Sequence, residues 1–259
     1  MTDITNLAAA LDDAAVRAGA IGQLSLDHPA LDVATAYRIA RASIDRRVAR
    51  GERIIGMKMG FTSRAKMAQM GVDDLIWGWL TDAMLVADGG STPHGRFIHP
   101  RIEPELAVRL KTPLRGEVTA IEAWAAVEAV APALEIIDSR YRDFRFSLAD
   151  VVADNASSSA FVVGAWQRPD FDVANLGMVM SIDGTPVQFG SSAAILGHPQ
   201  RSLVAAARLA GEAGFALETG WTVMLGAATP AEAVAPGARV RLETQGMATV
   251  DVTLAGAAA

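Results

Sequence analysis

Hydrophobic spacing along this chain is helical up to Gly51 and strand-like after it. Apolar residues recur at helical spacing over 6–18 and again over 31–48, which predicts two helices in the first fifty residues. Beyond Gly51, short apolar strands follow one another closely between Gly- and Pro-marked turns. Because these strands bunch instead of alternating with helices, we expect an α+β fold with a mixed sheet, not a doubly wound one. Residues 1–52 form the predicted helical part and residues 53–259 the predicted β-rich core, together one compact unit.

Several segments after Gly51 carry specific signals. The predicted strands are ERIIGMKMG, DAMLVADGG, RFIHPRIEPELAVRL, PALEIIDSR and SSAFVVGAW. Asp183-Gly184 and Gln245-Gly246 are typical turns of two-stranded hairpins. Helices are predicted over 120–130 and 201–213, and a short helix is expected to begin at Thr62 or Ser63.

The composition excludes several classes of protein. The chain has no cysteine, so disulfides, thiolate metal sites and a cysteine nucleophile are ruled out. It is 51% hydrophobic, yet no run of about 18 apolar residues predicts a membrane span. A formal charge of −6 argues against nucleic acid as a partner. Because the N-terminus is acidic where a secretory signal would be basic, we expect a cytoplasmic protein.

The segment Arg101-Ile102-Glu103-Pro104-Glu105-Leu106 places two acids on one face. Residues two apart in a strand point the same way, so Glu103 and Glu105 project together. Glu135 lies within an apolar strand, where an unpaired carboxylate is costly to bury. Three carboxylates without thiolates suit a hard cation such as Mg²⁺ or Mn²⁺. Two alternatives to a metal site stay open. Glu-X-Glu is common on solvated strand faces, and Glu135 could pair with an arginine.

Lysine is rare in this sequence, which makes Lys58 conspicuous. It lies between Gly56 and Gly60 in a predicted strand, where glycines permit close backbone approach. An inward-pointing lysine could stabilise an enolate, and a plain ion pair at the strand end is an equally good explanation. The run Asp154–Ser159 is suited to receiving a carboxylate, although such runs are usually ordinary turns. His99 and His198 both precede proline. Either could be catalytic, although a hydrogen-bonded structural histidine is the more common case.

Five blocks of sequence, taken together with these residues, carry a family resemblance. The chain resembles the fumarylacetoacetase-related decarboxylase/hydratase family of aromatic meta-cleavage pathways over nearly its whole length. The blocks are GMKMGFTSRAKMAQMGV, FIHPRIEPEL, PALEIIDSRYRDFRF, VVADNASSSAFVVG and AAILGHP. The first block and the segment Arg140–Phe146 resemble the decarboxylase branch more than the hydratase branch.

The resemblance implies a mixed β-roll or barrel core with a helical N-terminal part. It also implies roles for particular residues of this chain. Glu103, Glu105 and Glu135 match the family's Mg²⁺ ligands and Lys58 its active-site lysine. The residues in motifs that line the family's site are Asp82 and Asp154, with expected catalytic roles, and Leu80, Asp138, Asn155 and Ser158, with expected substrate contacts. The chain departs from the family pattern at 190–193 and 225–229, which puts contacts to the far end of the substrate in doubt.

The implied activity is decarboxylation of 2-oxohex-3-enedioate, a small 2-oxo dicarboxylic acid, to 2-hydroxypenta-2,4-dienoate in aromatic hydrocarbon catabolism. A hydratase acting on 2-hydroxypenta-2,4-dienoate is the first alternative. A non-catalytic partner subunit of that hydratase is the second, and retention of Lys58 and the three glutamates argues against it. The resemblance further implies a complex with the pathway's hydratase, and a homo-oligomer is also compatible with the sequence.

Overall fold

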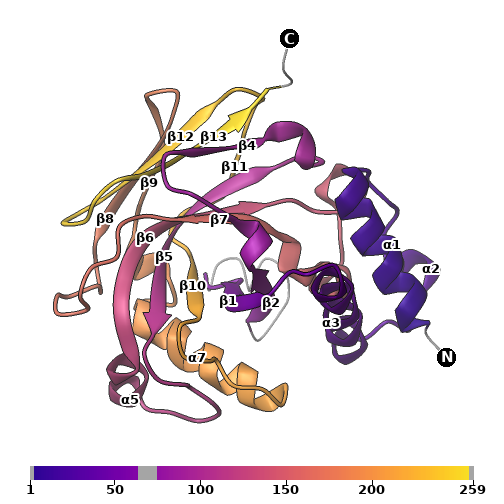
Figure 1. The fold of residues 1–259 in the computed structure, drawn as a ribbon, viewed down its shortest axis with the longest axis horizontal. Helices are drawn as coiled ribbons and strands as arrows, with labels where there is room; N and C mark the ends of the chain where they lie inside the picture. The colour runs from indigo at the N-terminus through magenta and orange to yellow at the C-terminus, as the bar shows by residue number, and fades with distance from the viewer. Residues whose placement is uncertain (1–2, 64–74, 257–259) are drawn as a thin grey trace.

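The computed structural model describes residues 3–63 and 75–256. Helices and strands are mixed, with the helical N-terminal segments beside a curled sheet (Figure 1). This arrangement confirms the α+β expectation. The short helix predicted to begin at Thr62 or Ser63 falls on residues 64–74, outside the described residues.

The N-terminal segment forms the two predicted helices and one short helix that was not predicted. They are α1 (Ile4–Arg17), α2 (Leu24–Asp27) and α3 (Val33–Ala49). Aspartates cap both long helices: Asp3 accepts the Asn6 N–H and Asp32 accepts the Thr35 N–H. α1 packs on α3, and α3 packs in turn on α6 (Leu148–Ala153), which joins the helical part to the rest of the fold.

A large mixed sheet forms the centre of the molecule. Its strand order is β2-β1-β10-β5-β6-β7-β3, and β11 pairs with β5. The strands are β1 (Ile54–Gly60), β2 (Ile76–Thr81), β3 (Leu85–Val86), β5 (Arg101–Leu110), β6 (Val127–Ile137), β7 (Ser158–Val163), β10 (Thr222–Ala227) and β11 (Glu232–Ala233). β1 runs parallel to β10 and β3 parallel to β7, while the other pairings are antiparallel.

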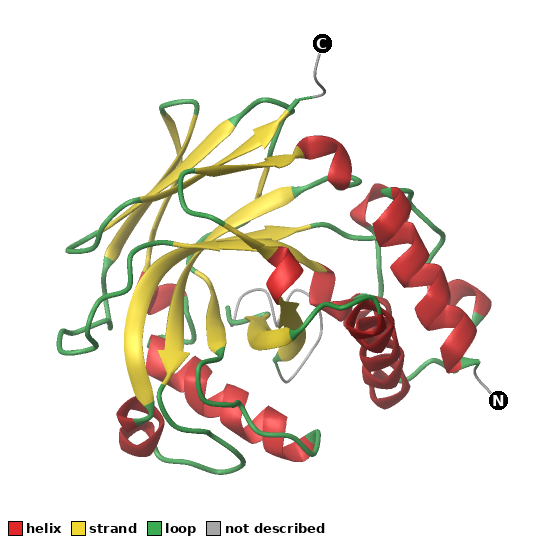
Figure 2. Ribbon diagram, viewed as in Figure 1, coloured by secondary structure: helices red, strands yellow, loops and turns green. Residues whose placement is uncertain are grey.

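A second, smaller sheet packs against one face of the large one (Figure 2). Its strands, in the order β4-β13-β12-β8-β9, are β4 (Gly90–Pro93), β8 (Gly177–Ile182), β9 (Thr185–Ser191), β12 (Arg239–Thr244) and β13 (Val250–Ala255). Both predicted hairpins are present. Asp183 and Gly184 have φ angles of 50° and 78°, as a type I′ turn requires, and Gly246 has φ 73°.

Alternating side chains on β6 divide between the two faces of the large sheet. Leu134 and Ile136 pack against the small sheet, so Glu135 points to the opposite, concave face. α7 (Pro199–Glu212) packs against β10 and β1 with its apolar residues in the main core. Apolar side chains of the main core therefore lie at one end of the concave face. Glu135 lies further along the same face.

Two boundary predictions were wrong. The helix predicted over 120–130 ends early, as α5 (Ala120–Ala125), because β6 already begins at Val127 and pairs along its length with β5. Tertiary strand pairing here outweighs helix propensity. The strand predicted over DAMLVADGG begins instead as a 3₁₀ turn and retains only the two residues of β3 and Gly90, the first residue of β4. The 3₁₀ turns are η1 (Asp82–Met84), η2 (His94–Arg96), η3 (Arg142–Phe144), η4 (Asn155–Ser157) and η5 (Ser192–Ala194).

Candidate metal centre

Three carboxylates gather on the concave face of the large sheet. One oxygen from each of Glu103, Glu105 and Glu135 lies within 4.8 Å of the others. All three side chains are buried, and Glu103 stands directly opposite Glu135 in the β5–β6 register. Like charges placed opposite each other destabilise a sheet. Such an arrangement calls for a compensating cation.

Glu105 has one satisfied and one unsatisfied oxygen. Its Oε2 accepts the Gly226 N–H at 2.8 Å. Its Oε1 is buried and has no hydrogen-bond partner among the described residues. Buried polar atoms are almost always partnered. An unpartnered buried oxygen therefore indicates a missing partner, and a metal ion would be one.

Lys58 reaches the same cluster from β1. Its Nζ lies 3.2 Å from Glu135 Oε1 and 3.3 Å from Oε2. β1 and β6 are separated by β10 and β5, so in a flat sheet they would lie about 14 Å apart. The contact therefore depends on the curl of the sheet, which brings the two side chains together across its concave face.

The electrostatics of the cluster favour a bound cation. Burial raises the pKa of Glu105 well above its ordinary value, and repulsion from Glu135 and Glu103 raises it further. Burial also raises the pKa of Glu135, although Lys58 opposes this rise. A bound divalent ion would stabilise the charged forms of both Glu105 and Glu135. Carboxylates without sulfur or histidine are the ligand set that Mg²⁺ or Mn²⁺ prefers. The residues present therefore fit the expected ion.

A cavity of about 620 Å³ opens next to the carboxylates. Its lining includes Lys58, Glu103, Phe61, Ile76, Arg101, Ile137, Phe144, Arg145, Phe146, Val151, Ala156 and Ser157. Four of these hold left-handed φ angles between 52° and 58°: Phe61, Phe144, Ala156 and Ser157. Such backbone is costly for residues other than glycine and clusters at ligand sites, so it supports a functional role for this cavity.

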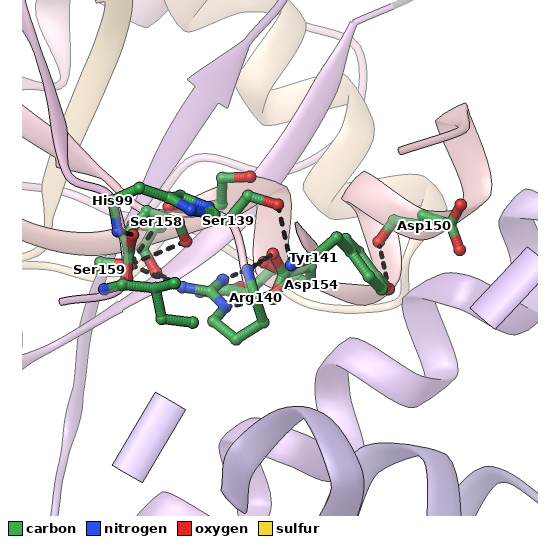
Figure 3. A network of polar contacts seen from close by, with 12 residues as sticks. His99, Ser139, Arg140, Tyr141, Asp150, Asp154, Ser158 and Ser159 are labelled. Atoms are coloured by element: carbon green, nitrogen blue, oxygen red, sulfur yellow. Dashed lines mark hydrogen bonds and ion pairs between the residues drawn. The ribbon is translucent and has the colours of Figure 1, made fainter. Parts of the chain in front are cut away.

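The predicted residue Asp154 lies in a buried polar network with Arg140 and Ser159 (Figure 3), and Asn155 follows it in the chain. Asp154 forms an ion pair with Arg140 and accepts the Arg140 N–H at 3.0 Å. Burial raises the pKa of Asp154 to about 6, with Arg140 opposing the rise. Asn155 bonds both polar groups of the Trp79 backbone, at 2.7 and 2.9 Å. These contacts hold η4 against β2.

Asp138 and Ser158 belong to the same region. Asp138 accepts the backbone N–H groups of Ile98 and His99, each at 2.8 Å, and so fixes the segment that leads into β5. The Ser158 hydroxyl is buried and has no hydrogen-bond partner among the described residues. A separate cavity of about 250 Å³ is lined by Asp138, Asp154, Asn155 and Ser158. Their predicted parts in catalysis and substrate binding remain predictions.

The structure does not bring Leu80 or Asp82 to the carboxylates. Leu80 is fully buried in the main core beneath the sheet. Asp82 begins η1 and accepts the backbone N–H and the Nε–H of Arg53, each at 2.9 Å. Those bonds, the backbone one first, lower the pKa of Asp82. Both residues lie outside the described lining of the large cavity.

His99 and His198 lie in different parts of the fold. His198 caps α7 by accepting the Gln200 N–H, and the His99 ring lies 5.1 Å from the Phe144 ring. The sequence analysis missed Arg101 and Phe61 as cavity residues. Arg101 could have been found, because it lies two residues before Glu103 and so shares its face. No helix in the described parts of the chain is both long and apolar enough to cross a membrane.

Known proteins resemble this chain over almost its full length. It is 58% identical to a 4-oxalocrotonate decarboxylase of Pseudomonas sp., over 98% of either chain. It is 37% identical, over 90% of either chain, to a 2-hydroxyhexa-2,4-dienoate hydratase of Comamonas testosteroni. The solved 4-oxalocrotonate decarboxylase from Pseudomonas putida G7, complexed with magnesium and adipate, superposes with a TM-score of 0.95 at 39% identity, covering 99% of this chain and 98% of the other. Since the model of the fumarylacetoacetate (FAA) hydrolase C-terminal family also matches residues 54–255, the chain belongs to the fumarylacetoacetate hydrolase family.

Proposed function

We propose that this protein is a Mg²⁺-dependent decarboxylase that converts 2-oxohex-3-enedioate (4-oxalocrotonate) to 2-hydroxypenta-2,4-dienoate. The observation that carries the proposal is the buried cluster of Glu103, Glu105 and Glu135 with Lys58 in contact. The higher identity to a decarboxylase than to a hydratase supports this choice of reaction.

Glu103, Glu105 and Glu135 would hold the ion, with the 2-oxo acid end of the substrate beside them. When bound, Mg²⁺ supplies a Lewis acid that stabilises negative charge on the substrate's 2-oxygen. The ring faces and aliphatic groups of Phe61, Ile76 and Ile137 line the adjoining cavity and limit the access of water.

The substrate is a vinylogous β-keto acid. Breaking the C5–C6 bond releases CO₂, and the bonding electron pair moves through C4 and C3 to the oxygen on C2. Lys58 carries the only ammonium group among the described residues that line the cavity. It would stabilise the resulting oxyanion or give it a proton, which yields the enol product. Loss of the distal carboxylate as neutral CO₂ is favoured where its charge is not strongly stabilised in the ground state.

The test is to incubate the purified protein with Mg²⁺ and 2-oxohex-3-enedioate and to follow CO₂ release together with the ultraviolet absorbance of the dienoate. We expect both to appear together and a chelator to block both. Consumption of supplied 2-hydroxypenta-2,4-dienoate without any CO₂ release would make the protein a hydratase. Inactivity in both assays would favour the non-catalytic partner subunit.

We further propose that the protein forms a complex with the pathway's hydratase, or a homo-oligomer. We also propose that it is located in the cytoplasm. The decarboxylation product is the substrate of such a hydratase, so association would pass it on directly. Size-exclusion chromatography of the protein alone and mixed with the hydratase measures both kinds of assembly.

A further inference from the structure

Two arginines without an acidic partner line the cavity beside the carboxylates. Arg101 and Arg145 are both exposed, and neither guanidinium forms an ion pair or side-chain hydrogen bond with the described residues. By contrast, the ion pairs of the fold engage many of the chain's other arginines, such as Arg53 and Arg140. Arg101 and Arg145 therefore place two positive charges in the lining of the cavity.

The position of Arg101 is well defined. It precedes Glu103 by two residues on β5 and so lies on the same face of the strand. Its guanidinium lies 4.5 Å from the ring centre of Phe144, a cation–π distance. Phe144 is presented by two successive left-handed residues, with φ 58° at Asp143 and 57° at Phe144. This costly backbone conformation holds the Phe144 ring next to the Arg101 guanidinium. Arg145 follows Phe144 directly in the chain.

We propose that Arg101 and Arg145 determine specificity by recognising the distal carboxylate of a dianionic substrate. This inference rests on the proposed function, in which the substrate carries two carboxylates and the product one. The whole chain carries a formal charge of −6, so a dianion is repelled at long range. Two unpaired cations at the cavity offset this repulsion locally and favour a dicarboxylate over a monocarboxylate of the same length.

Exposure of the two arginines suits this role. A carboxylate that is held tightly by a buried cation is stabilised in the ground state, which would oppose its loss as neutral CO₂. Solvent-exposed ion pairs are weak and are screened by salt. Arg101 and Arg145 therefore attract and orient the dianion, and their effect belongs in KM and in ligand affinity, not in kcat.

The test compares the affinities of two six-carbon ligands, 2-oxoadipate (a dianion) and 2-oxohexanoate (a monoanion), for the Mg²⁺-loaded protein by calorimetry. The variant is R101Q/R145Q, with R145Q alone as a second variant that leaves the Phe144 contact in place. R142Q is the matched control, because Arg142 is exposed on the same segment and lies outside the described lining of the cavity. We expect the double variant to bind 2-oxoadipate about threefold to tenfold more weakly, with 2-oxohexanoate changed less than twofold.

The salt dependence of 2-oxoadipate binding should also shrink in the double variant. Equal weakening of both ligands, or the same loss in R142Q, would overturn the proposal. Because binding is measured without turnover, the two proposals fail separately. A wild-type protein that prefers 2-oxoadipate through these arginines but releases no CO₂ would contradict the decarboxylase assignment alone.

Discussion

The Lys58 ammonium lies 3.2 Å from Glu135 Oε1 although their strands are three positions apart in the sheet. Both side chains are almost fully buried. The contact compensates the charge of Glu135, while Glu105 Oε1 is buried with no hydrogen-bond partner among the described residues. The contact also fixes the ammonium group beside the place where the substrate's 2-oxygen would lie.

Replacement of Lys58 by alanine should lower turnover more than about tenfold, or roughly 1.4 kcal/mol of barrier, because the described lining of the cavity loses its ammonium group. The measurement is kcat for CO₂ release at saturating Mg²⁺. K111A is the control, since Lys111 is exposed and lies outside the described lining of the cavity. A loss of kcat smaller than tenfold would show that Lys58 has a purely structural role.

The substitution E105Q should abolish activity while the fold stays intact. The amide keeps the shape of the side chain but removes the charge of a ligand whose Oε1 has no other described partner. We expect Mg²⁺ affinity to fall more than about 100-fold, because even residues behind the ligands change affinity 10–100-fold. Calorimetric titration with Mg²⁺ measures this directly.

Stability provides a second readout for the same variant. Mg²⁺ should raise the Tm of the wild type and leave that of E105Q unchanged. E128Q is the matched control, because Glu128 lies on the exposed side of β6 and pairs with Arg109. Near-normal turnover of E105Q with stoichiometric Mg²⁺ would falsify the metal assignment.

Gly226 should be essential to the position of Glu105. Its φ is +109°, its N–H binds Glu105 Oε2, and an added Cβ would lie 2.2 Å from Thr62 Oγ1. G226A should therefore lower both the Tm and the Mg²⁺ affinity. Gly220 has φ +81° with no atom within 4 Å of an added Cβ, so G220A has backbone strain but no clash. Equal losses in the two variants would show that strain alone is responsible.

Local sequence patterns predicted the strand faces but not the partners across them. Period-two spacing placed Glu103 and Glu105 on one face, and the structure agrees. The pattern could not show that β10, more than a hundred residues later, inserts between β1 and β5. That insertion, together with the curl of the sheet, is what allows Lys58 to reach Glu135.

Residues in suggestive motifs were harder to place. Leu80 and Asp82 lie close in sequence to Ile76, which lines the cavity. Leu80 is instead buried in the main core, and Asp82 pairs with Arg53. The end of α5 was misjudged for a related reason, since pairing of Val127 with Leu110 depends on a distant strand. In each case the deciding contact is long-range and has no local signal.

Asp154 gives a prediction about pH. Its folded-state pKa of about 6 exceeds the ordinary value of 3.8, so the folded protein holds this proton more tightly than the unfolded chain. The stabilising contribution of the carboxyl is therefore complete below about pH 4 and is lost as the pH rises to about 6. In D154N the amide does not titrate. Relative to D154N, the wild-type free energy of unfolding should fall by up to about 3 kcal/mol between pH 4 and pH 7.

Urea unfolding of both proteins at pH 4, 5, 6 and 7 measures this difference. D170N is the control, because Asp170 is exposed and the substitution makes the same change of side chain outside the buried network. The sign of the slope is decisive. If the wild type instead gains stability relative to D154N as the pH rises, pairing with Arg140 outweighs burial, and the buried ion pair stabilises the fold at neutral pH.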